Sequence, residues 1–572
     1  MKRRKAKKNW IIASVSAVII AIVGLVAFGL LQTQLFPKEP TKLETPKNFE
    51  YTMNVTIKER ETQHLLSWDI ANNATGYKII IKRETDETPI EKEVDKYTQE
   101  YNISDLVTEN ENYTVTLVAL GDEEDYLTSE TTEISFKAEV ATKGLFYESL
   151  KDGYEVSRGD AGYSSNLVMP DTYNGERIIK IADNAFGSIR SSDPMMKSVR
   201  YPSRLQELGE FAFANCTYLD NVVLPETATQ IGAQAFRGCS SLKNIRLPSE
   251  LKVLPKNCFM DCQLLKNIAL PKTLERIEYG VFCGCGKLEG IDLPKNLTYI
   301  GEISFQNTTF TKISIPDSVK YIGTAAFDQI GSSARGLETV EFSENLCLDF
   351  MGMEIFHGTK WYENQPSGFI CFNDMLYRYK ESETDENIVI DNYPEDVRKI
   401  ACGAFKNCEK LVSVVLLDGI DEINESTFDN CSSLETVQIL DGVKLIGEKA
   451  FNDCTSLKSV QLPNSVKQIG INAFSGCKSL EEMIIPNGLE EIGDYAFRNC
   501  KDLTNVYYKG SMEDWSKITI DEICAFAYIT DLTFYYYSET EPPMNSDGTG
   551  YDGNYWYYDE NGVPVVWIYT EE

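Results

Sequence analysis

The feature that most constrains the fold of this chain is a repeat of 23 residues, anchored by a phenylalanine with a cysteine three residues later. The repeat is clearest in the C-terminal half, at Phe405, Phe428, Phe451, Phe474 and Phe497. An earlier series keeps the same step at Phe213, Phe236, Phe259, Phe282 and Phe305. A fixed period of about 20–50 residues is typical of a solenoid, in which each coil buries its apolar face only against its neighbours. The sequence therefore predicts an elongated array of coils and not one compact core.

One repeat contains enough apolar residues to close a coil. Val460 and Leu462 alternate on a short predicted strand that ends at Pro463, and the next apolar residues turn inward around the rest of the coil. Gly470 suits a corner that needs either a positive φ or a close backbone approach. At a strand spacing of about 4.8 Å, stacked coils would align the phenylalanines in one column and the cysteines in another.

The run Ile-Gly-x-x-Ala-Phe-x-x-Cys-x-x-Leu-x-x-Val-x-Leu-Pro, present from Ile446 to Pro463, resembles the BspA-like leucine-rich repeats of bacterial surface proteins. The resemblance extends from about Ile181 to Tyr508 and covers most of the chain. It implies a mainly β, or α+β, solenoid. It also implies binding and adhesion at a cell surface rather than catalysis, and it does not say what any one member binds.

Breaks in the period divide the array. We predict an N-terminal cap at 139–181, a first repeat block at 182–327, an irregular insert at 328–400, a second block at 401–510 and a C-terminal cap with an aromatic hairpin at 511–572. The insert contains a predicted hairpin that turns at Asn373–Asp374. We interpret the insert as a structural break between two arrays rather than as a dedicated binding loop.

The run from Tyr555 to Trp567 predicts a second hairpin, because Asn561-Gly562 suits a type I′ turn. The run resembles one unit of the aromatic repeats that bind cell walls. Those repeats work as tandem arrays, whereas this chain has one copy, so we expect a structural hairpin.

The N-terminus carries a predicted export signal. Residues 1–9 form a basic tail, residues 10–31 are uncharged and mostly apolar, and residues 32–44 form a linker that contains prolines. A helix over 10–31 could cross a bilayer core of about 30 Å, and the preceding cations leave the N-terminus in the cytoplasm. We therefore predict a single-pass signal anchor with the bulk of the chain outside the cell. The alternative is secretion after signal cleavage, although a signal peptide normally has a shorter apolar region.

Residues 45–138 alternate apolar and polar residues in short runs, which predicts an all-β immunoglobulin-like sandwich. The runs Leu66-Ser-Trp-Asp and Tyr113-x-Val-x-Leu-x-Ala resemble a fibronectin type III domain. The resemblance implies that Trp68 fills the core and that Tyr113 makes the corner hydrogen bond. Because the segment contains no Arg-Gly-Asp tripeptide, we interpret it as a spacer rather than as an adhesion module.

The composition limits both partners and chemistry. A net charge of −32 repels phosphate backbones, so we expect no nucleic-acid partner. The two histidines, His64 and His357, lie far apart in the sequence, which argues against the usual catalytic triads and catalytic zinc sites. We predict no cofactor, no metal site and no enzymatic activity. Carboxylate-only hydrolysis, as in glycosidases, is a remote alternative.

The 15 cysteines follow the repeat. Exported proteins often form disulfides, but one cysteine in each repeat suggests a small buried packing residue with a free thiol. The cysteines at this position are Cys216, Cys239, Cys262, Cys285, Cys408, Cys431, Cys454, Cys477 and Cys500.

The outward positions of the predicted strands form the face on which a ligand would lie. No single charge and no aromatic stripe runs along these positions, which favours a protein partner over a polysaccharide or a nucleic acid. The candidate binding residues are Asn244, Arg246, Asp292, Lys312, Glu341, Gln438, Gln461, Glu482 and Tyr507.

These features together predict a non-catalytic cell-surface protein that recognises a protein or glycoprotein partner through its solenoid. The alternative is a protein that organises the cell envelope by contacting the cell wall or neighbouring surface proteins. The predicted anchor and the single aromatic hairpin favour that alternative. An envelope hydrolase that uses paired carboxylates ranks third.

Overall fold

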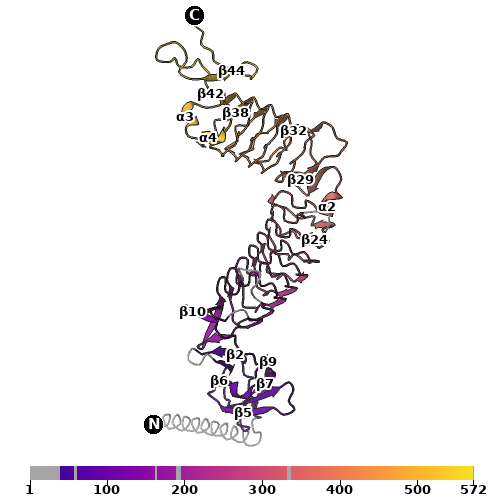
Figure 1. The fold of residues 1–572 in the computed structure, drawn as a ribbon, viewed down its shortest axis with the longest axis vertical. Helices are drawn as coiled ribbons and strands as arrows, with labels where there is room; N and C mark the ends of the chain where they lie inside the picture. Colours follow the sequence, from indigo (N-terminus) through magenta and orange to yellow (C-terminus); the bar gives the residue numbers. More distant parts are fainter. Residues whose placement is uncertain (1–38, 57–60, 162–163, 188–194, 331–335, 571–572) are drawn as a thin grey trace, which may run out of the picture.

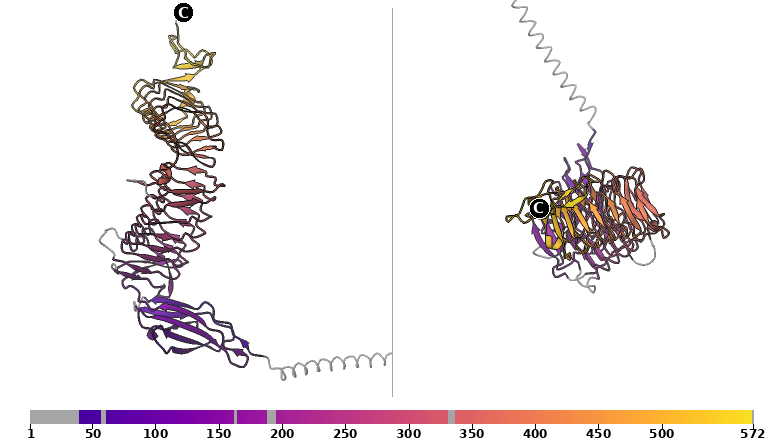
Figure 2. Two further views of the ribbon diagram at one scale, coloured as in Figure 1. Left: turned by 90° about the vertical axis from the view of Figure 1, so that its right-hand side faces the viewer. Right: turned by 90° about the horizontal axis from the view of Figure 1, so that it is seen from above.

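The computed structural model describes residues 39–56, 61–161, 164–187, 195–330 and 336–570. These residues form an elongated, bent array in which a β-rich unit precedes two stacks of coils (Figures 1 and 2). Among the described residues the only α-helices are α2 (Lys360–Glu363), α3 (Met512–Trp515) and α4 (Glu522–Ala525). The prediction of a mainly β solenoid is therefore confirmed.

The predicted signal anchor at 10–31 and the basic tail before it lie outside the described residues, as do residues 32–38 of the linker. Within the described ranges, no helix is both long enough and apolar enough to cross a membrane. Membrane anchoring thus stays a prediction made from the sequence.

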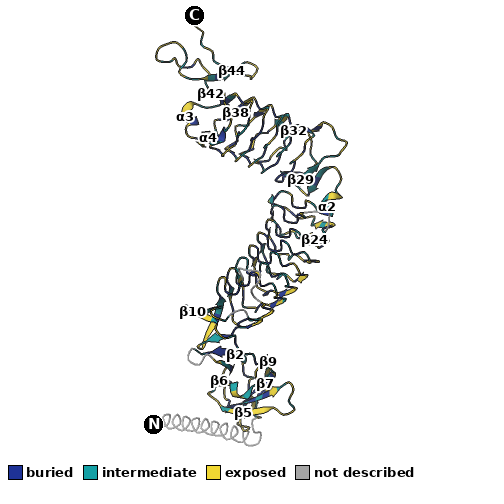
Figure 3. Ribbon diagram, viewed as in Figure 1, coloured by how far each residue is buried: buried dark blue, intermediate teal, exposed yellow. Residues whose placement is uncertain are grey.

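Most coils contribute two short strands. A front strand follows the Cys-x-x-Leu segment, and a two-residue back strand precedes the next phenylalanine. Front strands alternate exposed and buried residues, because one side of each strand faces the core (Figure 3). In the first stack the front strands are β17 (Asn221–Val223), β19 (Asn244–Arg246), β21 (Asn267–Ile268), β24 (Lys312–Ile315) and β26 (Thr339–Phe342). The back strands are β16 (Glu207–Leu208), β18 (Gln230–Ile231), β20 (Val253–Leu254), β22 (Arg276–Ile277), β23 (Tyr299–Ile300), β25 (Tyr321–Ile322) and β27 (Phe350–Met351).

The second stack repeats this plan and ends in a longer sheet. Its front strands are β30 (Ile388–Ile390), β32 (Leu411–Val415), β34 (Thr436–Gln438), β36 (Ser459–Gln461), β38 (Glu482–Ile485) and β40 (Asn505–Tyr508). Its back strands are β33 (Glu422–Ile423), β35 (Leu445–Ile446), β37 (Gln468–Ile469), β39 (Glu491–Ile492) and β41 (Thr519–Ile520). The sheet of β36, β38 and β40 continues into β42 (Thr533–Tyr537), β43 (Tyr555–Tyr558) and β44 (Pro564–Val566). Because β43 and β44 pair antiparallel, the predicted C-terminal hairpin is present.

Phenylalanine rings stack along the centre of both stacks. The centroids of Phe213 and Phe236 lie 5.6 Å apart, and those of Phe451 and Phe474 lie 5.1 Å apart. Phe356 stacks on Phe327 at 5.5 Å, although it falls 29 residues later in the sequence. The first stack therefore extends beyond residue 327, where the sequence analysis ends the first block.

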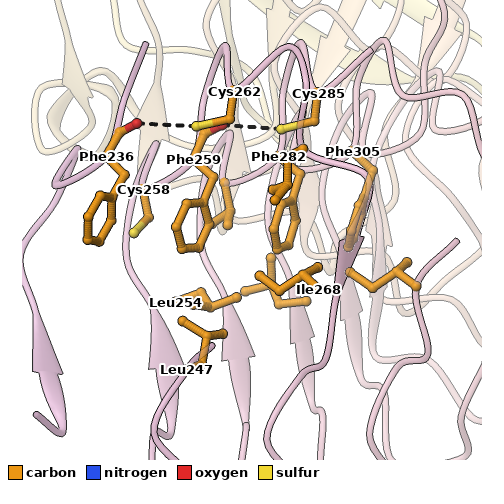
Figure 4. Close-up of a cluster of buried hydrophobic side chains, with 14 of the residues drawn as sticks. Phe236, Leu247, Leu254, Cys258, Phe259, Cys262, Ile268, Phe282, Cys285 and Phe305 are labelled. Atoms are coloured by element: carbon orange, nitrogen blue, oxygen red, sulfur yellow. Dashed lines mark hydrogen bonds between the residues drawn. The ribbon is translucent and has the colours of Figure 1, made fainter. Parts of the chain in front are cut away.

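The cysteine column lies beside the phenylalanine column (Figure 4). The thiol of Cys262 donates a hydrogen bond to the backbone oxygen of Phe236 at 3.2 Å, one coil earlier. Cys285 bonds Phe259 in the same way at 3.2 Å. All fifteen cysteines are free, and the nine at the repeat position are buried, as the sequence pattern predicts.

Two left-handed residues turn most coils, one two positions before the phenylalanine and one two positions after it. Asn472 and Gly476 take these positions around Phe474, with φ of 55° and 76°. Asn, Asp and Gly dominate the second position because they adopt this conformation most readily. Gly470 has no positive φ, and a Cβ there would lie 2.7 Å from the backbone nitrogen of Glu448. Of the two reasons for a glycine there, close approach is the correct one.

A hairpin joins the two stacks at the bend. It consists of β28 (Gly368–Phe372) and β29 (Met375–Lys380), and β29 pairs in parallel with β31 (Lys399–Ile400). Tyr377 packs into the core of the first stack, whereas its neighbour Leu376 packs into the core of the second. The insert is thus a spacer coil whose two faces belong to different cores.

The N-terminal unit contains two antiparallel sheets around a shared core. One sheet contains β2 (Glu50–Val55), β3 (Thr62–Ser67) and β6 (Glu100–Asn102). The other contains β5 (Ile90–Asp95), β4 (Gly76–Arg83), β7 (Asn112–Leu120) and β9 (Thr132–Lys137). The remaining elements are β1 (Thr41–Lys42), which pairs with β8 (Tyr126–Leu127), and the 3₁₀ turn η1 (Ser104–Leu106). Trp68 is buried in the core, and the hydroxyl of Tyr113 accepts a hydrogen bond from the Thr108 nitrogen at 2.7 Å.

The N-terminal unit is joined to the solenoid cap by strand pairing. The cap contains β10 (Phe146–Leu150), β11 (Gly153–Ser157), β12 (Asn166–Val168), β13 (Thr172–Tyr173), β14 (Glu176–Ile181) and β15 (Ser198–Arg200). Strand β2 of the unit pairs in parallel with β13 of the cap, so one sheet runs through both. Asp171 reinforces the joint, because its buried carboxylate accepts hydrogen bonds from the Met53 nitrogen and from Arg200, each at 2.8 Å.

Candidate binding faces

The front strands present their outward side chains side by side; we call this surface the rung face. Parallel pairing places Asn244 between Asn221 and Asn267, and Gln461 beside Ile484. Eight of the nine candidate residues are exposed there or on the segment that continues it. They are Asn244, Arg246, Asp292, Lys312, Glu341, Gln438, Gln461 and Glu482.

Polar contacts between coils organise the rung face of the first stack. The Asn244 side-chain amide donates to the Asn221 side-chain oxygen at 2.9 Å. Lys312 and Glu341 form an ion pair at 2.5 Å, and both side chains are about half exposed. Exposed pairs of this kind are worth roughly 0–1 kcal/mol, so a partner can displace them at low cost.

In the second stack, uncharged polar groups dominate the rung face until its C-terminal end. The Thr436 hydroxyl bonds that of Ser413 at 2.8 Å, and Gln438 and Gln461 lie further along. Glu482 supplies a carboxylate at the next coil. The face therefore carries varied hydrogen-bonding groups with little charge of one sign, which suits a folded protein surface.

The structure corrects the placement of Tyr507, which is only 5% exposed. Its ring stacks on Tyr535 at 5.3 Å and lies 5.4 Å from Trp556, because β42 and β43 extend the sheet past β40. Burial raises the pKa of Tyr507 to about 12. Tyr507 therefore belongs to the packing of the C-terminal cap and not to an open binding surface.

A ladder of stacked rings on the back strands was missed by the sequence analysis. Tyr299 stacks on Tyr321 at 4.4 Å, Tyr321 stacks on Phe350 at 4.7 Å, and the Arg276 guanidinium lies 3.8 Å from the Tyr299 centroid. A sugar would need an open ring face, but each face between these groups is covered by its neighbour. The ladder therefore stabilises the back strands, and it does not form a saccharide platform. The spacing of these residues departs from the period after Tyr299, which hid the pattern.

A cavity of about 180 Å³ lies at the junction of the two stacks. Glu354, His357, Arg378, Cys402 and Asn407 line it. The Arg378 guanidinium donates to the backbone oxygens of Gly403 at 2.6 Å and Lys406 at 2.5 Å. Arg378 thus joins the hairpin to the second stack, and its guanidinium is already hydrogen-bonded to protein oxygens instead of facing a ligand.

His357 ends a chain of polar side chains that crosses several coils. The Cys283 thiol contacts Gln306, the Gln306 amide donates to Asp328 at 3.0 Å, and Asp328 bonds the Nδ1 atom of His357 at 3.0 Å. Cys402 lines the same cavity as His357, but burial raises the pKa of its thiol to about 12. A thiol that stays protonated at neutral pH is a poor nucleophile, so this arrangement does not support cysteine chemistry.

Across the described ranges, no three histidine, cysteine, aspartate or glutamate side chains gather closely enough to hold an ion. His64, the second histidine, instead lies in the N-terminal unit with its Nδ1 atom 2.6 Å from the Tyr51 hydroxyl.

The fold and its repeating Phe–Cys columns define a leucine-rich repeat solenoid. The model of the BspA type leucine rich repeat region matches residues 179–309, 254–364 and 384–536, which is more than half of the chain. The chain therefore belongs to the BspA type leucine-rich repeat family. Comparison with curated proteins gives no match.

Several solved structures resemble the chain. A leucine rich cell surface protein from Faecalibacterium prausnitzii is 26% identical, with 66% of this chain and 97% of that one covered and a TM-score of 0.39. A leucine-rich repeat protein from Bacteroides ovatus is 26% identical, with 69% and 98% covered and a TM-score of 0.27. The pneumococcal vaccine antigen PcpA is 17% identical, with 70% and 93% covered and a TM-score of 0.35. The family membership rests on the repeat match and not on these scores.

Proposed function

We propose that this chain is a non-catalytic surface protein that binds a protein or glycoprotein partner through the rung face. The observation that carries the proposal is the rung face itself. Its side chains are exposed and held in register, while the coil interior beneath is filled by phenylalanine, cysteine and leucine. Such a surface can bind a partner without catalysing a reaction.

A surface location is supported by the family and by the name of the F. prausnitzii relative, a leucine rich cell surface protein. The proposal includes an anchor at 10–31 and a fibronectin type III-like spacer at 45–138. The buried Trp68 and the Tyr113 hydroxyl bonded by Thr108 support the second assignment. Because β2 pairs with β13, this spacer would hold the solenoid at a fixed angle.

A protein partner fits the rung face better than other macromolecules. A nucleic acid is disfavoured by the net charge of −32. A polysaccharide would need repeated open aromatic faces, and Tyr507, the one aromatic candidate residue of the rung face, is only 5% exposed. Varied polar groups over a core of this kind are typical of protein recognition.

The C-terminal hairpin favours a second candidate function, which is contact with the cell wall. Tyr557 and Trp567 lie 4.5 Å apart with planes tilted by 43°, and both are partly exposed. Tilted, partly open rings could stack on a sugar. In this role the chain would organise the envelope rather than adhere to another cell.

A binding assay tests both functions. Purified chain lacking residues 1–38 would be measured side by side against immobilised matrix glycoproteins and isolated cell wall. The double variant Gln438→Arg/Gln461→Arg changes the rung face, and Gln468→Arg/Thr519→Arg makes the same charge change on the back strands. The proposal expects saturable binding to a glycoprotein that weakens only in the first variant.

If the chain binds isolated cell wall and no glycoprotein, the result would contradict the adhesion function and support the envelope function. Equal loss in both double variants would show that binding depends on general charge and not on the rung face.

A further inference from the structure

A hollow lies where the N-terminal unit meets the solenoid cap. It is a groove of about 1050 Å³, just above the range of roughly 300–1,000 Å³ found for small-molecule pockets. Val55, Val107 and Val140 line it from the N-terminal unit and the linker, and Phe146 and Tyr173 line it from the cap. Its size and its mixed apolar and polar lining suit a ligand longer than a single small molecule.

Strand β10 lines the groove through Phe146 and Tyr147. Strand β10 is the outermost strand of the sheet that runs through the cap and the N-terminal unit, and it pairs only with β11 among the described strands. Phe146, on β10, is 56% exposed, which is unusual among the phenylalanines that the structure describes. A free strand edge presents unpaired N–H and C=O groups, which another extended backbone can complete.

The charged side chains among the described residues that line the groove are mainly negative. Glu61, Glu109 and Asp160 line it with one opposing ammonium group, that of Lys143. None of the three carboxylates forms an ion pair with another described residue, and all three are exposed. His64 adds no cation, because burial lowers its pKa from the ordinary value. The groove is therefore suited to a positively charged occupant.

We propose that this groove binds an extended peptide segment of a partner protein, in which basic side chains alternate with apolar ones. The segment would add as a strand to the free edge of β10. Its apolar side chains would contact Phe146 and Tyr173, and its basic side chains would reach Glu61 and Glu109. The site lies apart from the rung face and does not depend on the function proposed for that face.

The test uses the purified full chain and short fluorescent peptides. One peptide alternates valine and threonine around two lysines. The control peptide has the same sequence with glutamates in place of the lysines. Fluorescence polarisation should show saturable binding of the lysine peptide only. The variant Glu61→Lys/Glu109→Lys should weaken binding at least about tenfold, whereas Glu87→Lys/Glu93→Lys, on exposed positions of the same unit, should leave it unchanged.

Backbone pairing is tested separately by methylating alternate peptide nitrogens. Because only every second N–H of an added strand points to its neighbour, one methylated set should lose binding and the other should keep it. Equal binding of both sets, no binding of the lysine peptide, or self-association of the chain through this edge would overturn the proposal. The rung-face variant Gln438→Arg/Gln461→Arg should leave peptide binding intact, so failure of one function is distinguishable from failure of the other.

Discussion

The thiol of Cys454 donates a hydrogen bond to the backbone oxygen of Phe428 at 3.1 Å, and the same bond links Cys477 to Phe451. This bond connects the two columns that define the repeat. The phenylalanine fills the coil, and the cysteine of the next coil gives its carbonyl oxygen a second donor beside the backbone nitrogen three residues later. A small apolar residue would fill the space but leave that oxygen without its donor from the next coil.

The buried thiols predict loss of stability at alkaline pH. Burial raises the pKa of Cys216 to about 12 and that of Cys454 well above its ordinary value near 9. An unfolded chain loses these protons above about pH 9, whereas the folded chain keeps them. The free energy of unfolding should therefore be constant from pH 7 to about 8.5 and fall as pH rises beyond 9. Urea titration at pH 8 and pH 10 measures it, and equal midpoints would contradict the prediction.

Ser304 offers a stabilising substitution. It is fully buried at the position before Phe305, where most coils carry alanine, and its hydroxyl has no hydrogen-bond partner. An unsatisfied buried hydroxyl costs roughly 1–3 kcal/mol, so Ser304→Ala should raise the free energy of unfolding by about 1 kcal/mol.

Thr427 provides the control for Ser304. It occupies the same position before Phe428, but its hydroxyl donates to the Asn424 oxygen at 2.7 Å. Thr427→Ala should lower the free energy of unfolding by about 1 kcal/mol. Changes of the same sign in both variants, measured by chemical denaturation, would contradict the explanation.

Gly470 should not tolerate a side chain. A Cβ there would lie 2.7 Å from the Glu448 nitrogen and from the backbone carbon of Gly447, and backbone atoms cannot move aside cheaply. Gly470→Ala should therefore cost more than about 2 kcal/mol. Gly290, whose Cβ would meet nothing within 4 Å, is the matched control, and Gly290→Ala should change stability by less than about 0.5 kcal/mol. Thermal unfolding of both variants gives the comparison.

Arg378 should hold the two stacks together. Its guanidinium donates to Gly403 and Lys406, whereas exposed Arg398 donates to two carbonyl oxygens in its own loop. Arg378→Ala should cost about 2–4 kcal/mol and speed hydrogen exchange at the junction. Arg398→Ala should leave exchange at the junction unchanged. An Arg378 variant whose exchange pattern matches the parent would show that the apolar contacts of the hairpin suffice.

Asp171 should fix the N-terminal unit on the cap. It is 2% exposed, and its carboxylate accepts hydrogen bonds from Met53, Arg200 and Ser203. Asp171→Asn leaves Arg200 without its buried partner charge, so it should cost about 3–5 kcal/mol and speed exchange in β2 and β13. Glu50→Gln removes only the exposed ion pair with Arg204 and should have little effect.

The repeat made the coil predictable, because the residues that close it lie close together in sequence. Phe474, Cys477 and Gly470 take the positions that their spacing indicated. Features that depend on distant pairing were not predictable in this way. Phe356 joins the ring column despite a longer step, and β29 inserts between two cores through contacts that no local pattern encodes.

The rung face was predicted for the same reason, and that prediction was wrong at the C-terminal end of the face. Seven residues on strands that alternate outward and inward side chains are exposed, and so is Asp292 on the segment that continues the face. Tyr507 is covered because β42 and β43 return to the sheet from further along the chain. No sequence pattern predicted the groove beside β10, because its walls come from segments that meet only when the N-terminal unit docks on the cap.

The hairpin at the bend also bears on how such a gene can change in length. Within either stack, duplication of one whole coil adds a ring and a thiol that meet identical neighbours, so the array can grow without disturbing what is already there. Strand β29 permits no such duplication, because Tyr377 and Leu376 face different cores. Natural variants of this chain should therefore differ by whole coils on either side of a hairpin that stays single.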